Sequence, residues 1–556
     1  MSMIRRALVL AVPCVLAACA SAGSGDGPGS GRPAIDAAAF ESQVARLASD
    51  EFEGRKPGQR GERTTLDYLV AEFQRIGLKP GNGDSYLQKV PFVEITAGSD
   101  AALQLGAQSL AIGPDAVVWT KRVQPEARFE DSPLVFVGHG VVAPEYGWND
   151  YAGLDMRGKT AVILVNDPGW DGDDKSMFNG RAMTYYGRWT YKFEEAARQG
   201  AAAALIVHET APAAYGWDTV VNSWSGPQLD MVTPDGNRGR VAIEGWITRE
   251  ATQRLLAEAG QDLDALKRRA AQRGFRGIEL GLEASGSVRN AIRRAESANV
   301  VGLIPGTQRP GEYVVYVAHW DHLGRAIGRS GDTIFNGAVD NATGTAGLLE
   351  IAAAFQRGKA PQRSVVFLAV TLEESGLLGS AYYTSQPIFP LAQTVAVLNM
   401  DAIYDGGPTR DVSVSGFGAS ELEAYLAAAA KRQGRVLVPE ATPEKGFFYR
   451  SDHFNFAKAG VPALYFKAGV DHRENGAAFG QKQRDDFDAQ RYHRQADEYR
   501  PGMDWRAAVE DLELFHAVGA RLAREKSFPN WYPDNEFRAQ RDRSRAVMDA
   551  GPAKAR

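Results

Sequence analysis

The sequence lacks the features of several common classes of protein. Its formal net charge is −5 over 556 residues, which is too small to attract nucleic acid by bulk electrostatics, so we expect no nucleic-acid partner. It contains no Gly-x-Ser-x-Gly nucleophile motif and no His-Glu-x-x-His motif, since Glu209 follows His208 without a second histidine at the required spacing. Neither a serine hydrolase nor a protease of that zinc class is therefore supported.

Long apolar stretches are also missing at the N-terminus. The apolar run at residues 7–17 is too short to span a bilayer and leads into Cys19. It resembles a bacterial lipoprotein signal, which implies that residues 1–18 are removed and that Cys19 is acylated. The protein would then be exported and anchored by lipid to a membrane, facing the periplasm. Ala20 does not signal retention in the inner membrane, so location in the outer membrane is also compatible with the sequence. A plain secretory signal is the alternative, and it also predicts export.

Cysteine is almost absent. The chain has 2 cysteines, and only Cys19 remains once residues 1–18 are removed. The mature protein then has no internal disulfide and no thiolate cluster for a structural metal. Any metal must be bound through nitrogen and oxygen atoms. Residues 19–35 are rich in glycine and serine and predict a flexible linker.

The remaining sequence is typical of globular protein. It is 44% hydrophobic and 24% charged, and its length favours two domains. Helical periodicity comes first, followed by short β-type runs around one helix, and then by buried strands that alternate with helices. The last pattern predicts a doubly wound, largely parallel sheet. The predicted parts are an N-terminal part of the main domain (36–109), an inserted small module (110–290), the main catalytic domain (291–530) and a C-terminal tail (531–556).

Six short stretches contain side chains that can bind divalent cations. They are AHWDHLG (318–324), AVDNATG (338–344), TLEESG (371–376), LNMDA (398–402), SDHFNF (451–456) and RYHRQAD (491–497). Three of them follow predicted strands, and the carboxyl ends of parallel strands are where such sheets bind ligands. Two neighbouring cations need imidazoles, several carboxylates of which one bridges, and a base that is not a ligand.

These stretches supply each of those groups. The imidazole candidates are His319 and His493, the bridging carboxylate is Asp340, the terminal carboxylates are Glu374 and Asp401, the base is Glu373, and Asp321 supports His319. Each residue taken singly also has a structural interpretation. Asp340 could cap the following helix, although Asn341 or Thr343 can do so instead. Tyr492 and His493 could simply lie on the surface.

The same pattern resembles the co-catalytic di-zinc aminopeptidases, a family that also includes glutamate carboxypeptidase and the transferrin receptor. The shared elements are His-x-Asp, Asp-Asn, Glu-Glu, an aspartate after a strand and a late Tyr-His, and the likeness covers most of residues 36–525. Residues 110–290 resemble a protease-associated domain. The resemblance implies a three-layer α/β/α domain with a mostly parallel central sheet, and an inserted smaller β-rich domain.

The resemblance also implies roles for individual residues. One Zn²⁺ would be held by His319 and Asp401 and a second by Glu374 and His493, with Asp340 bridging, a cis peptide after Asp340, and Glu373 as general base. Asp452, His453 and Tyr492 would lie beside the metals or the substrate. His322 would belong to the same loop as His319 without being a ligand, and His139 and His208 would be structural.

The expected activity is removal of N-terminal residues from peptide substrates by a zinc-dependent aminopeptidase. Three alternatives remain within the resemblance: a carboxypeptidase with arginines for the terminal carboxylate (Arg325, Arg329 or Arg450), a glutaminyl cyclase, and a receptor-like homologue without catalysis. The complete set of candidate ligands disfavours the receptor, while two metals and an inserted module disfavour the cyclase. The expected residue preference at the cleaved end stays open.

Overall fold

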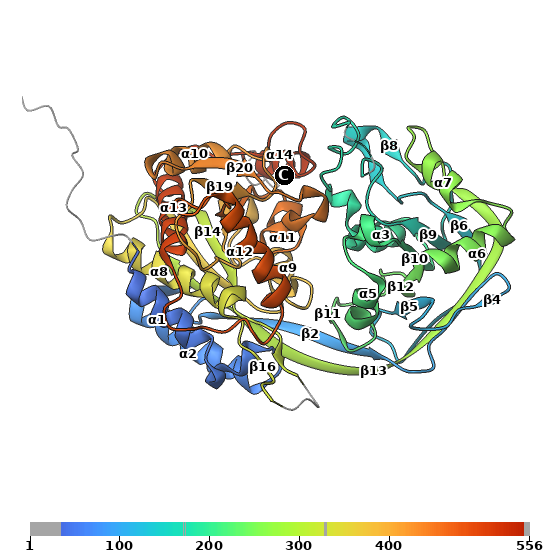
Figure 1. Cartoon of the computed structure of the whole chain (residues 1–556), viewed down its shortest axis with the longest axis horizontal. Coiled ribbons are helices and arrows are strands. Elements are labelled where there is room, and N and C mark those ends of the chain that lie inside the picture. The colour runs from blue at the N-terminus through green and yellow to red at the C-terminus, as the bar shows by residue number, and fades with distance from the viewer. Residues whose placement is uncertain (1–34, 171, 173, 327–330, 550–556) are drawn as a thin grey trace, which may run out of the picture. The chain divides into compact units, whose positions relative to one another are not determined.

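The structure is a computed structural model that describes residues 35–549 except 171, 173 and 327–330 (Figure 1). The predicted signal, Cys19 and most of the linker lie outside the described residues. Within the described part of the chain, no helix combines the length and apolar character needed to cross a bilayer.

The first sheet has a parallel centre. β14 (Arg309–His319) lies between β17 (Arg363–Val370) and β18 (Thr394–Asn399) and is parallel to both, and β18 is parallel to β21 (Ala463–Ala468). Antiparallel strands extend both edges. At one edge β13 (Ile278–Ile304) pairs with β17, and β2 (Leu87–Ala97) and β1 (Lys79–Pro80) pair with β13. At the other edge β19 (Asp411–Val414) pairs with β21, and β20 (Val436–Pro439) is parallel to β19.

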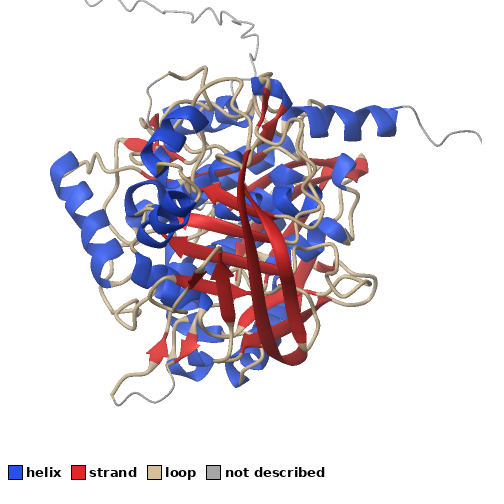
Figure 2. Ribbon diagram, turned by 90° about the vertical axis from the view of Figure 1, so that its right-hand side faces the viewer, coloured by secondary structure: helices blue, strands red, loops and turns tan. Residues whose placement is uncertain are grey.

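Helices cover both faces of this sheet because its central strands are apolar on both sides. Along β14, Val314 and Tyr316 face one core, whereas Val315 and Val317 face the other. The first core contains residues of α1 (Ala37–Leu47), α2 (Arg60–Ile76), α8 (Thr343–Arg357), α10 (Leu422–Arg432) and α13 (Arg506–Leu522). The second contains residues of α9 (Leu378–Ser385) and α11 (His453–Lys458). The result is the predicted mixed α/β arrangement of three layers (Figure 2).

A second sheet lies within residues 102–289. Its parallel strands are β6 (Glu126–Phe136), β9 (Thr160–Leu164), β10 (Ala203–His208) and β12 (Ile243–Thr248), with β3 (Ala102–Leu105), β4 (Gln108–Ser109) and β5 (Ala116–Trp119) added antiparallel. Its helices are α3 (Trp189–Arg198), α5 (Trp217–Trp224), α6 (Arg249–Glu258) and α7 (Leu263–Ala270). Its two faces bury separate apolar cores. β13 is 27 residues long and pairs first with β6 and later with β17, so it belongs to both sheets (Figure 1).

The structure differs from the predicted boundaries in three places. β3 and β4 precede residue 110 but pair in the second sheet. β11 (Gln228–Met231) lies within the predicted insert, yet it pairs antiparallel with β2 of the first sheet. The predicted tail is folded, since Trp531 is fully buried against the second core of the first sheet and α14 (Arg538–Asp549) follows. Trp531 is surrounded in the sequence by polar and charged residues, so the local pattern did not predict that this segment packs against the core.

The other helices and strands are short or peripheral. They are β7 (Val142–Ala143), β8 (Trp148–Asn149), α4 (Thr210–Ala213), β15 (Gly324–Arg325), β16 (Ile334–Phe335) and α12 (Ala477–Gln490).

Candidate metal centre

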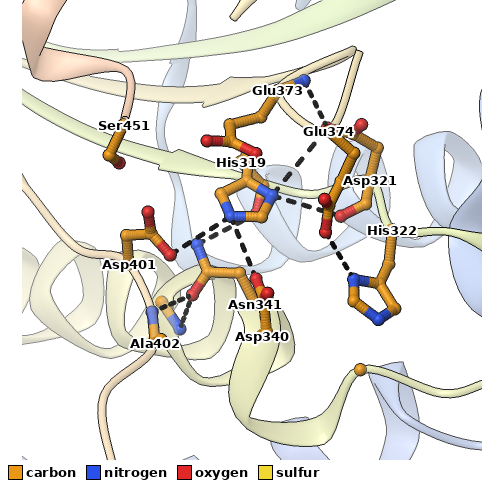
Figure 3. A network of polar contacts seen from close by, with 12 residues as sticks. His319, Asp321, His322, Asp340, Asn341, Glu373, Glu374, Asp401, Ala402 and Ser451 are labelled. Atoms are coloured by element: carbon orange, nitrogen blue, oxygen red, sulfur yellow. Dashed lines mark hydrogen bonds and ion pairs between the residues drawn. The ribbon is translucent and has the colours of Figure 1, made fainter. Parts of the chain in front are cut away.

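Three of the predicted residues meet because neighbouring parallel strands end together. His319 is the last residue of β14, Glu374 follows β17 and Asp401 follows β18. β14 lies between the other two strands, so the three side chains gather at one edge of the sheet (Figure 3). The prediction that these strand ends form one site agrees with this arrangement.

Asp340 enters the same site from the segment that leads into α8. The peptide between Asp340 and Asn341 is cis, as the resemblance implied. The side chain of Asn341 caps α8, because its Oδ1 accepts from the N–H of Gly344 at 2.9 Å, and it also accepts from Ala402 N at 3.1 Å. Capping by Asn341 leaves the carboxylate of Asp340 free to face the imidazole of His319 (Figure 3).

The two oxygens of Asp340 face two different histidines. Its Oδ1 lies 3.4 Å from His319 Nε2, and its Oδ2 lies 3.2 Å from His493 Nε2. His319 Nε2 is also 3.3 Å from Asp401 Oδ1, and His493 Nε2 is 3.2 Å from Glu374 Oε2. Each imidazole thus shares Asp340 and has one further carboxylate of its own. This donor set fits two neighbouring cations that share Asp340.

The loop with His493 reaches this site because it is tied to the segment of Asp340. Asp497, four residues further on, is fully buried. Its Oδ2 accepts from the backbone N–H groups of Val339 and Asp340, both at 3.0 Å. The ring of Tyr492 stacks on the ring of His493 with centroids 4.0 Å apart. These contacts place His493, although the sequence around it resembles an ordinary polar surface.

The charges of the site depend on one another. Burial by itself would lower the pKa of His319, but Glu373, Asp401 and Asp340 hold it well above its usual range. Burial likewise opposes ionisation of Glu374, yet His493 and His322 bring its pKa down to about 2. The imidazoles of His319 and His493 thus favour protons because the carboxylates around them are in excess. A divalent cation can replace those protons, so the electrostatics also fit metal binding.

Glu373 behaves differently from its neighbour. Burial, together with the charges of Asp401 and Glu374, raises the pKa of Glu373 well above its usual range. A raised pKa makes the carboxylate of Glu373 a stronger base, which suits a group that takes a proton from water. Its backbone N–H donates to Asp321 Oδ1 at 3.1 Å.

Asp321 does not support His319 in the way that the sequence predicts. His319 Nδ1 lies 3.2 Å from the backbone oxygen of Asp321 but 3.9 Å from its carboxylate. The carboxylate accepts instead from the backbone of Glu373. Asp321 thus fixes the imidazole through its main chain and the Glu373 loop through its side chain.

The sequence predicts that His322 is not a metal ligand, but the structure places it among the candidate ligands. Its Nδ1 lies 2.7 Å from Glu374 Oε1, and the ring is buried. Together with Asp340 and Glu374 it forms one of the groups whose atoms are close enough to hold a metal ion. Its place three residues after His319 was the available signal, since a turn at the strand end brings both imidazoles to the same edge.

Asp452 and His453 are hydrogen-bonded to residues outside the set of candidate ligands. Asp452 Oδ1 accepts from Ser380 Oγ at 2.6 Å, and burial raises the pKa of Asp452 to about 7. His453 is fully buried between aromatic rings, and its Nδ1 is 3.3 Å from Asn399 Nδ2. Burial lowers the pKa of His453 to about 3, so its ring is neutral.

Comparison with known proteins assigns a family to this segment. The sequence model of "Peptidase family M28" matches residues 299–518. Residues 299–518 belong to peptidase family M28. All the candidate metal ligands lie within this M28 domain.

The M28 domain also has similar relatives. The chain is 36% identical over 127 residues to the mouse (Mus musculus) aminopeptidase NAALADL1, which is 22% of this chain and 16% of that protein. It is 33% identical over 117 residues to a probable glutamate carboxypeptidase, LAMP1, of Arabidopsis thaliana, which is 20% of this chain and 16% of that protein. The matches therefore span about a sixth of each relative. Among solved structures, an aminopeptidase from Aneurinibacillus sp. strain AM-1 is 19% identical, with a TM-score of 0.49 over 89% of this chain and 95% of that chain.

Proposed function

We propose that the M28 domain is a di-zinc aminopeptidase that releases N-terminal residues from peptides. The observation that carries this proposal is the position of Asp340, whose two oxygens face the two imidazoles. His319 and Asp401 would hold one zinc ion, and His493 and Glu374 the other. Bound zinc would polarise the scissile carbonyl and make the attacking water more acidic.

The residues of the chain perform the proton transfers and the positioning. Glu373 accepts the proton of the attacking water and later gives a proton to the leaving amine. Asp321 holds the backbone of Glu373, so that its carboxyl group stays beside the reacting atoms. Bound zinc would also bind the free amino terminus of a peptide, and the nearest peptide bond would then be the first one.

Substitution of the base tests this proposal. Glu373→Gln keeps the volume of the side chain but cannot accept the proton, so we expect kcat to fall by about 10²–10⁴-fold. The zinc content, measured by atomic emission, should remain that of the parent. Glu374→Gln is the matched control, because loss of a ligand should lower zinc content as well as kcat. Near-normal turnover by Glu373→Gln would refute the assignment of the base.

A carboxypeptidase is the second candidate, and two arginines favour it. The Nε atoms of Arg188 and Arg450 are buried and have no hydrogen-bond partner among the described residues. Burial first, and then the nearby charge of Arg450, lower the pKa of Arg188 to about 9. A terminal carboxylate would neutralise this pair. Peptides blocked at the amino end or amidated at the carboxyl end, each assayed with and without a chelator, distinguish the two candidates.

Export remains a proposal as well. We infer from the N-terminal pattern that Cys19 is acylated and that the enzyme faces the periplasm on a lipid anchor. Incorporation of a labelled fatty acid into the wild-type chain, but not into Cys19→Ser, tests this. Release of Cys19→Ser as an unlabelled exported protein would be the expected result, and labelling of both forms would contradict it.

A further inference from the structure

The backbone bends sharply just before the proposed base. Leu372 precedes Glu373 and has a φ of 56°. This left-handed conformation costs a residue with a Cβ on the order of 1–2 kcal/mol. The bend ends the alternation of β17, in which neighbouring side chains point to opposite faces. It allows Glu373 and Glu374 to reach the same site.

The bend is not held by the sheet alone. Backbone bonds close the loop, with Leu378 N donating to Leu372 O and Gly379 N to Thr371 O, both at 3.0 Å. These bonds fix the ends of the turn, but the side chain of Leu372 must also be accommodated. It is fully buried. The contacts of that side chain therefore stabilise the unusual conformation.

The contacts come from a small apolar cluster, and part of it belongs to β11. Leu372 and Leu378 pack with Val90 and Phe92 of β2, and Leu229 and Met231 cover this group. In the pairing of β11 with β2, Leu229 lies opposite Glu94 and Met231 opposite Phe92. We call these six residues the Leu372 cluster.

β11 alternates as an edge strand should. Between Leu229 and Met231, Asp230 Oδ2 lies 3.4 Å from Lys121 Nζ, next to β5 of the second sheet. Leu229 and Met231 thus lie on one face of β11, toward the four buried members of the Leu372 cluster, while Asp230 faces the other way. β11 is reached from α5, and the chain returns from it to β12, both in the second-sheet region.

We infer that β11 is a positioning strand for the peptidase: Leu229 and Met231 hold Leu372 in its left-handed conformation and thereby fix Glu373 beside the reacting atoms. The region of the second sheet thus takes part in turnover without touching the substrate. This inference rests on the proposed function, because it needs Glu373 as the base. The partners of β11 described above are β2, the apolar residues around Leu372 and Lys121, and none of these is a candidate metal ligand. Removal of the β11 contacts should therefore misplace the base and leave the metals in place.

The test is the double substitution Leu229→Ala and Met231→Ala in the full-length protein. We expect kcat to fall by about 10–100-fold, since a displacement near 1 Å has that effect on a catalytic group. KM and zinc content should change less than about twofold. The exchange Leu229→Met with Met231→Leu conserves the apolar contact and should restore kcat. Leu282→Ala is the matched control, because Leu282 is a partly buried leucine of β13 that packs on the second sheet.

The outcomes separate the inference from the proposed function. A kcat for the double variant that is equal to that of Leu282→Ala overturns the inference, as does loss of zinc in proportion to activity. If the double variant does not fold, Met231→Ala alone is measured in the same way, and an unchanged kcat then has the same meaning. Full activity of Glu373→Gln overturns the proposed base, whatever the β11 variants do.

Discussion

In both sheets, charged residues lie at or just after the carboxyl ends of the parallel strands. The two sheets differ in whether these charges are neutralised by side chains of opposite charge. In the first, His319, Glu374 and Asp401 follow parallel strands and face one another with negative charge in excess. In the second, β10 leads into Glu209 and β12 into Arg249, and these two form an ion pair. Lys267 Nζ contacts Glu209 at 2.7 Å as well. Strand ends in the same position can therefore bind a cation only where arginine and lysine do not already neutralise the carboxylates.

Loss of the carboxylate of Asp340 should have the largest effect on zinc binding and activity. Asp340→Asn keeps the volume but removes the charge between the two imidazoles. We expect zinc to be lost from both positions and kcat/KM to fall by about 10³-fold or more, which corresponds to several kcal/mol of transition-state stabilisation. Zinc analysis and peptide assays measure this. Asp264 Oδ1 lies 2.6 Å from Arg249 at the charged edge of the second sheet, and Asp264→Asn is the control that should keep full activity. Retention of two zinc ions by Asp340→Asn would remove the basis of the shared site.

Removal of His322 should have an intermediate effect. Its Nδ1 lies 2.7 Å from Glu374 Oε1, and such supports of a ligand change metal affinity by about 10–100-fold. We expect His322→Asn to lower the affinity for one of two zinc ions, as measured by competition with a chelator. Excess zinc should then restore kcat. If activity stays low at saturating zinc, His322 acts in turnover rather than in metal binding.

The sequence predicts the parts of this site that depend on local pattern. Apolar runs place β14, β17 and β18, and His319, Glu374 and Asp401 directly follow the runs. Parallel strands end at the same edge, so their meeting follows from topology. The position of Asp340 before a capped helix is local in the same sense, since Asn341 supplies the cap.

Contacts between distant segments are the part that the sequence cannot supply. The carboxylate of Asp497 holds the backbone of Asp340, and the buried side chain of Arg55 donates to the carbonyl of Trp320 at 2.9 Å. In the sequence, Asp497 and Arg55 cannot be told apart from ordinary charged surface residues. β11 pairs with a strand that lies more than a hundred residues away. Such partners are fixed by tertiary packing, which no local periodicity records.

A change at the charged edge of the second sheet should be visible only in stability. Glu209 is paired with Arg249 and Lys267, and all three side chains remain partly accessible to solvent. We expect Glu209→Gln to lower the free energy of unfolding by about 1 kcal/mol. The value of kcat should stay within about twofold of the parent. Thermal unfolding and peptide assays measure the two quantities, and a tenfold loss of kcat would mean that this edge also serves the reaction.

The smallest effect on turnover should come from a histidine that lies outside both of these charged strand edges. His516 of α13 packs edge-on against Phe355, with ring centroids 5.0 Å apart. Burial, together with Arg524 and Arg357, lowers the pKa of His516 to about 4. The unfolded chain therefore binds a proton below about pH 6.5 that the folded chain does not, so stability falls as the pH drops from 6.5 toward 4, by at most about 1.4 kcal/mol per pH unit. His516→Gln should flatten this slope relative to the parent in denaturant unfolding at pH 5 and pH 7, while kcat at pH 7 stays unchanged. Equal slopes would show that the ring is protonated in the folded state as readily as in the unfolded chain.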